Sequence, residues 1–119
     1  MKIDATQIDQ FNRDGYLLYE DLFDVEEMDL LLKIAKHDQR LEKEALERSD
    51  SSAIKSKLWI TDSLEDDIYS AFARCKRIVD PLEQLLGGEI YHYHHKMMLK
   101  EPFVGGSWEW HQDYGYWYS

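Results

Sequence analysis

The feature that most constrains the fold is a change of hydrophobic pattern at Gly87-Gly88. Before this pair, apolar residues recur at helical spacing, as in Leu82, Leu85 and Leu86. After it, residues 89–99 contain no Gly or Pro and begin with β-prone residues, which is typical of a strand. Helices followed by strands predict an α+β fold, in which helices pack on one side of an antiparallel sheet.

Helix-start signals divide the region before the glycine pair. We expect a short helix over residues 6–13, capped by Thr6 and ended by Gly15. Asp24, with Glu27 three residues on, has the pattern of a capping box and starts a longer helix. This longer helix is expected to bury an apolar stripe made of Val25, Met28, Leu31, Leu32 and Ala35.

A further helix is expected to start at Asp62 or Ser63 and to end before Pro81. One or two more helical turns then precede a left-handed cap at Gly87. The charged stretch 37–52 predicts a fraying helix end that passes into a loop. Strands are expected in four places, a long one over residues 89–99 and others over residues 16–19, 54–60 and 107–110.

Length and composition predict one domain over residues 1–119, with residues 1–88 mainly helical and residues 89–119 forming the first core strands. A formal net charge of −10 argues against nucleic acid and membrane surfaces as partners. Cys75 is the single cysteine, and the N-terminal residues lack the apolar core of a signal peptide, so we expect a cytoplasmic protein.

The last dozen residues contain a His-x-Asp pair, His111 and Asp113, set among aromatic residues. Side chains two apart on a strand point to the same face, so this pair could offer an imidazole and a carboxylate to one metal ion. Such a pair is two-thirds of the 2-His-1-carboxylate set that suits non-haem Fe(II). By composition alone, about half a His-x-Asp pair is expected per chain, so its sequence context must decide.

That context resembles the phytanoyl-CoA dioxygenase-like branch of the Fe(II)/2-oxoglutarate-dependent oxygenases. Residues 11–17 and 22–27 resemble the opening of that family, and residues 82–87 resemble the helix before its first core strand. The most specific likeness is residues 93–102, a Gly-containing loop and then residues 110–117. Family members are roughly twice this length or more, in keeping with a complete barrel domain.

The resemblance implies that the helices pack on the first strands of a double-stranded β-helix, or jelly-roll, core that is incomplete in this chain. It implies Fe(II) bound by His111 and Asp113, with 2-oxoglutarate as cosubstrate and a small organic molecule as substrate. The family also supplies a second metal-binding His and an Arg for 2-oxoglutarate, but no His or Arg follows Asp113 here. The 119-residue chain is therefore expected to be inactive alone.

Three more residues are candidates for contact with the cosubstrate. Lys96 and Met98 lie two apart and share one face of the expected strand, which the resemblance turns toward the cosubstrate pocket. An exposed edge lysine is the competing interpretation of Lys96. Trp117 could line the same pocket, or equally pack in the core like other large aromatic residues.

Two alternatives to an oxygenase fragment stay open. The first is a non-catalytic interaction module, such as a homodimer in which open strand edges of two chains pair. The second is a cupin-like metal-binding protein of other chemistry, which would draw its ligands from His92, His94 or His95.

Overall fold

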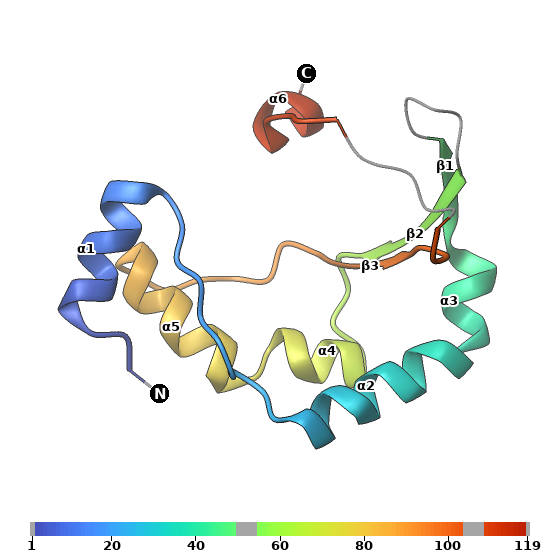
Figure 1. Cartoon of the computed structure of the whole chain (residues 1–119), viewed down its shortest axis with the longest axis horizontal. Helices are drawn as coiled ribbons and strands as arrows, with labels where there is room; N and C mark the ends of the chain where they lie inside the picture. Colours follow the sequence, from blue (N-terminus) through green and yellow to red (C-terminus); the bar gives the residue numbers. More distant parts are fainter. Residues whose placement is uncertain (1, 50–54, 104–108, 119) are drawn as a thin grey trace. The chain divides into compact units, whose positions relative to one another are not determined.

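The computed structural model describes residues 2–49, 55–103 and 109–118. The chain forms two compact units, Met1–Asp38 with Thr61–His95 and Gln39–Ile60 with Lys96–Ser119. Figure 1 shows the order of the helices and strands along the chain. Helices and a small sheet in one chain fit the expected α+β class, whereas a jelly-roll core stays a prediction.

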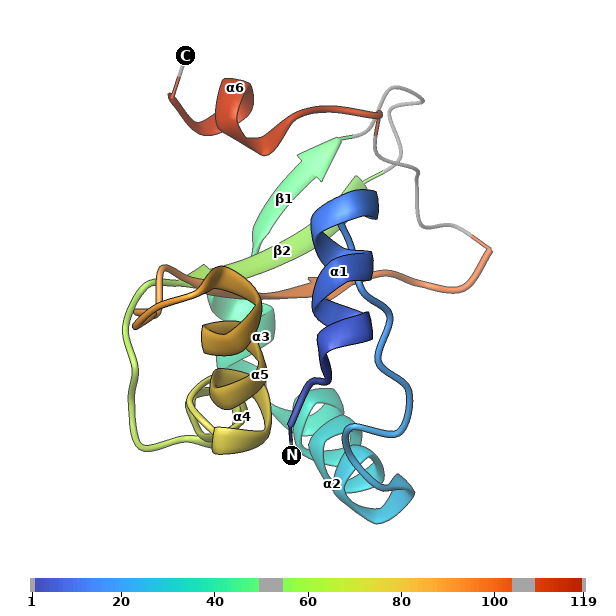
Figure 2. The same cartoon turned by 90° about the vertical axis from the view of Figure 1, so that its left-hand side faces the viewer.

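The first unit consists mainly of helices in its described residues. Its helices are α1 (Ala5–Asp14), α2 (Val25–His37), α4 (Ile68–Ala73) and α5 (Lys76–Leu86). Helix α5 packs against both α1 and α4, and α1 lies beside α5 in both views (Figures 1 and 2). The buried Tyr69 donates a hydrogen bond to Asp38 Oδ2 at 3.0 Å, and Ile3 N donates to Gln84 Oε1 at 3.1 Å. These contacts join residues far apart in sequence.

The ends of the first two helices follow local rules. Asp24 caps α2, and its carboxylate accepts from Glu27 N at 2.8 Å, which confirms the predicted capping box. Helix α1 ends at the left-handed Gly15 as expected, but Asp4 caps it, so the prediction of Thr6 was wrong. Asp4 is the cap because it forms a capping box with Gln7. Gln7 N donates to Asp4 Oδ1 at 2.9 Å, and Asp4 N donates to Gln7 Oε1 at 3.0 Å.

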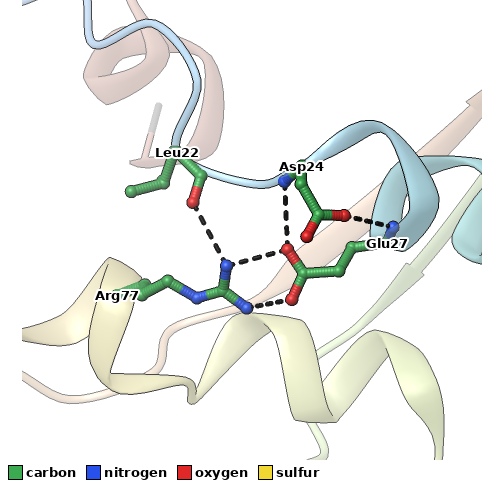
Figure 3. A network of polar contacts seen from close by, with 4 residues as sticks. All are labelled: Leu22, Asp24, Glu27 and Arg77. Atoms are coloured by element: carbon green, nitrogen blue, oxygen red, sulfur yellow. Dashed lines mark hydrogen bonds and ion pairs between the residues drawn. The ribbon is translucent and has the colours of Figure 1, made fainter.

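An ion pair links α5 to the start of α2 (Figure 3). The guanidinium of Arg77 donates through Nη1 to Glu27 Oε2 at 2.8 Å and to the Leu22 carbonyl at 3.4 Å, and through Nη2 to Glu27 Oε1. It also lies over the ring of Phe23, 4.6 Å from the centroid. The hydrogen bond from Arg77, with that from Asp24 N, lowers the pKa of Glu27 to about 2.

The expected apolar stripe of α2 is not buried, so that prediction was wrong. Val25 is 75% exposed and Leu32 is 51% exposed. Contacts hold α2 at both ends. Glu27 meets Arg77 in its first turn, Phe23 packs on Phe72 with ring centroids 4.7 Å apart, and the Tyr69 hydroxyl donates to Asp38, the C-cap of the helix. These contacts do not cover the apolar stripe, which stays largely open to solvent.

The second unit contains a few buried residues, among them Leu41, Leu58 and Trp59. Helix α3 (Gln39–Glu44) and strand β1 (Leu46–Ser49) occupy the stretch predicted as a fraying loop. That prediction failed because Leu41 is only 1% exposed and anchors the short helix among charged neighbours. The buried Trp59 donates through Nε1 to Glu44 Oε2 at 3.1 Å, and the Arg40 guanidinium lies 5.4 Å from its ring centroid.

The sheet has the strand order β1-β2-β3, with β2 at Lys55–Thr61 and β3 at His95–Leu99. Strands β1 and β2 pair antiparallel, with Leu46 opposite Leu58. The strand expected over 54–60 is thus confirmed, apart from residue 54, which lies outside the described residues.

Other expected strands are wrong in whole or in part. Residues 16–19 form no strand, and the strand predicted over 89–99 begins only at His95. Of residues 107–110, the first two lie outside the described residues and the last two form no strand. Among the described residues after β3, the regular element is a helix, α6 (Asp113–Tyr118). Aromatic β-propensity misled here because it is a weak and context-dependent preference.

The expected boundaries around α4 and α5 were also displaced. Asp67 caps α4, rather than Asp62 or Ser63, by accepting from Ser70 N at 2.8 Å. Pro81 does not end a helix but lies inside α5, where its ring is buried and packing offsets the lost hydrogen bond. Gly87 closes α5 in the left-handed conformation, φ 74°, as predicted.

None of the helices in the described part of the chain is both long and apolar enough to cross a membrane.

Candidate metal centre

The His-x-Asp pair lies where the chain enters α6. His111 belongs to an irregular segment, and Asp113 is the first residue of the helix. The extended strand from which the pair was predicted is therefore absent from residues 109–113. An acidic residue in the first turn favours a helix start at this point, because its charge complements the exposed backbone N–H groups.

The two side chains nevertheless converge. His111 Nε2 and Asp113 Oδ1 lie 3.0 Å apart, and His111 Nδ1 lies 2.8 Å from the backbone carbonyl of Glu109. A carbonyl only accepts, so Nδ1 carries the proton and donates it. In a neutral imidazole, Nε2 then presents a lone pair to a carboxylate, which also presents lone pairs. A positive species between them, a proton or a metal ion, relieves this repulsion.

The electrostatics of His111 agree with a demand for positive charge. The hydrogen bond to the Glu109 carbonyl raises the pKa of His111, and the Asp113 carboxylate raises it further. Partial loss of hydration and the positive charge of Lys96 oppose this increase in the pKa. Both members of the pair are open to water, with 41% of the His111 side chain and 71% of the Asp113 side chain exposed.

The structure describes the three predicted cosubstrate residues, Lys96, Met98 and Trp117, to different extents. Lys96 is exposed on β3 and acts electrostatically on His111, so the structure brings these two candidates into the same neighbourhood. Met98 is half-buried two residues further along β3. Trp117 lies on the backbone of α6, but its side chain is outside what the structure describes.

Sequence reasoning missed one polar group that contacts this pair, the backbone carbonyl of Glu109. It fixes which imidazole nitrogen faces Asp113. No side-chain pattern announces such a contact, because every residue carries a carbonyl. The described residues contain no group of three or more His, Cys, Asp or Glu side chains that could hold a metal ion.

Comparison with known proteins identifies the family. The family model described as phytanoyl-CoA dioxygenase (PhyH) matches residues 11–119. The chain belongs to this family. The match to this dioxygenase family includes the His111 segment and all three expected cosubstrate residues, and it confirms the resemblance seen in the sequence.

Curated relatives of this family member are enzymes named for small molecules. L-proline trans-4-hydroxylase of Streptomyces griseoviridis is 30% identical over 99% of this chain and 45% of its own length. Ectoine dioxygenase of Bordetella parapertussis is 29% identical over 98% of this chain and 39% of its own length. Ectoine dioxygenase of Halomonas elongata is 28% identical, with 36% of its length covered. The chain thus spans less than half the length of these relatives.

No solved structure matches the chain.

Proposed function

We propose that this chain is the N-terminal portion of a non-haem Fe(II)/2-oxoglutarate-dependent dioxygenase that hydroxylates a small organic substrate. The observation that carries the proposal is the convergence of His111 Nε2 and Asp113 Oδ1 at 3.0 Å, within a chain that belongs to a dioxygenase family. The names of the relatives support a small-molecule substrate of the size of proline or ectoine.

The spacing of the pair fits a metal ion. Two ligands with bonds of about 2.1 Å that meet a metal at a right angle stand about 3.0 Å apart. The same spacing suits a hydrogen bond, so it also matters which ring nitrogen of His111 carries the proton. The Glu109 carbonyl holds the proton on Nδ1 and leaves Nε2 available as a neutral imidazole ligand. One imidazole and one carboxylate form a donor set that suits Fe(II).

Each residue has a separate role in this proposal. His111 and Asp113 would hold Fe(II) on one side, and the Glu109 carbonyl would orient the imidazole. Lys96 would pair with a carboxylate of 2-oxoglutarate, because it is a cation whose field already reaches His111. Met98 and Trp117 would line the cosubstrate pocket. When bound, the iron supplies activation of O2 for hydroxylation of a C–H bond.

The 119-residue polypeptide is proposed to bind metal weakly and to lack turnover by itself. Fe(II) sites of this class use two His and one carboxylate, and no His follows Asp113 in this sequence. The Arg expected to hold the far carboxylate of 2-oxoglutarate is also missing after Asp113. We propose a cytoplasmic setting, in keeping with a single half-buried cysteine.

Metal affinity tests the ligand assignment. Fe(II) binding to the 119-residue protein is measured by anaerobic calorimetry for the unmodified chain, His111→Ala, Asp113→Ala and the control His37→Ala. His37 is a matched control because its Nδ1 also lies 2.8 Å from a backbone carbonyl, that of Lys33, on an exposed helix. We expect about tenfold weaker binding for each ligand variant and no change for the control.

Equal affinities for His111→Ala and His37→Ala would exclude the pair as ligands. Turnover is tested separately by succinate release from 2-oxoglutarate with Fe(II) and ascorbate. We expect no release above the protein-free background, and robust release by this polypeptide would contradict the proposed incompleteness.

A second candidate function is an interaction module that forms a strand-sharing homodimer. The observation in its favour is that β1 and β3 are the outer strands of the sheet within the described residues, and outer strands offer backbone groups for pairing. Light scattering after size-exclusion chromatography tests this idea, because a homodimer has twice the 14.2 kDa mass of the chain. A monomer at all concentrations would exclude it.

A further inference from the structure

The segment between α5 and β3 brings two imidazole rings together. His92 Nε2 and His95 Nδ1 lie 3.0 Å apart, with ring centroids 5.1 Å apart and planes inclined by 57°. Residues three apart on an ideal strand point to opposite faces, so extended geometry would separate these rings. The chain departs from a strand between them, which is where the predicted strand over 89–99 failed.

The residues between the two histidines are engaged with each other. The rings of Tyr93 and His94 are 4.9 Å apart at their centroids and inclined by 53°. The convergent pair is therefore His92 with His95, although three histidines occur within four residues. Both members of the pair are half-buried, which reduces competition from water at their ring nitrogens.

Two ring nitrogens at this spacing share either one proton or one cation. Ligands that meet a metal at a right angle stand about 3.0 Å apart when the bonds are about 2.1 Å long. Imidazole pairs suit Cu²⁺, Ni²⁺ and Zn²⁺, and affinity generally peaks at Cu²⁺. The pair contains no carboxylate, so its donor set differs from that of His111 and Asp113.

We propose that His92 and His95 form a second metal site, which takes a divalent transition ion that prefers imidazole and binds Cu²⁺ most tightly. Water completes the coordination, because the described residues provide no cluster of three protein ligands. The site is independent of the proposed oxygenase function and stands on the geometry of residues 92–95 alone.

Cu²⁺ binding to the 119-residue protein tests this site. All variants carry His111→Ala, which removes the candidate iron ligand from competition. We expect this parent to bind one Cu²⁺ with two imidazole nitrogens in its electron paramagnetic resonance spectrum. Adding His92→Ala should weaken binding about tenfold or more and leave one imidazole nitrogen. Adding His94→Ala, a matched control in the same segment, should change the affinity less than about twofold.

His92→Asn keeps a polar side chain and covers the case in which His92→Ala does not fold, which circular dichroism detects. It should weaken Cu²⁺ binding to the same extent. The proposal is overturned if the parent binds no Cu²⁺, if its spectrum contains a single imidazole nitrogen, or if His92→Asn and His94→Ala lose affinity equally.

Discussion

The helical unit and the His111 segment are held in shape by contacts of different range. In the helical unit, Arg77 bonds to Glu27, fifty residues away, and Ile3 bonds to Gln84, eighty-one residues away. The hydrogen bonds of His111 with the Glu109 carbonyl and the Asp113 carboxylate each reach two residues along the chain. These contacts of the first region need the packed fold, whereas these two contacts of His111 are local. Substitutions should therefore affect stability in one region and binding in the other.

The largest expected difference concerns two aromatic residues. Tyr69 is buried, 5% exposed, whereas Trp110 is 103% exposed. Tyr69→Ala should lower the free energy of unfolding by about 3–5 kcal/mol, because it removes a packed ring and the bond to Asp38. Trp110→Ala should change it by less than about 0.5 kcal/mol. Urea unfolding measures both, and similar losses would mean that the His111 segment is packed as tightly as the helices.

Substitutions at two glycines should change stability by smaller amounts and in opposite directions. A Cβ on Gly87 or Gly115 would meet no atom within 4 Å, so only backbone conformation differs. Gly87 has φ 74°, and Gly87→Ala should destabilise by about 1–2 kcal/mol. Gly115 lies inside α6, where Gly115→Ala should favour the helix by about 0.5–1 kcal/mol. Unfolding curves test the first variant and helix content by circular dichroism tests the second; a destabilising Gly115→Ala would contradict the helical assignment.

The smallest effect concerns acid and the Arg77 ion pair. Glu27 has a folded pKa of about 2 against an ordinary value of 4.5, so its contribution to stability is fully present above about pH 4.5. That contribution is lost as the pH falls toward 2. Glu27→Gln should be less stable than the unmodified chain at pH 7, and the gap should narrow on acidification. Unfolding free energies at pH 7, 4.5 and 2.5 measure it, and a gap independent of pH would exclude the ion pair as its cause.

Local signals in the sequence predicted the fold best. The Asp24 capping box and the left-handed Gly87 were found because each depends on a few neighbouring residues. Thr and Asp both cap helices, and Thr6 lies only two positions from Asp4, so residue type alone did not distinguish the two. The open stripe of α2 could not be anticipated, since periodicity reports which face is apolar and not what covers it. Pro81 was wrongly expected to end a helix, because its burial inside α5 depends on tertiary packing.

The candidate site was predicted in part. The spacing of two brought His111 and Asp113 together as expected, but through a helix start rather than a strand. The bend that joins His92 to His95 was missed because β-prone residues surround it. The role of the Glu109 carbonyl was invisible in principle, since main-chain groups leave no trace in residue identity.

The double use of the Glu27 carboxylate couples events that are usually separate in folding. One oxygen, Oε2, accepts both from the Asp24 backbone amide at 3.0 Å and from the Arg77 guanidinium at 2.8 Å. The first turn of α2 and the packing of α5 against it therefore use the same acceptor oxygen. Amide hydrogen exchange at Asp24 should consequently report on the docking of a helix that starts more than fifty residues later.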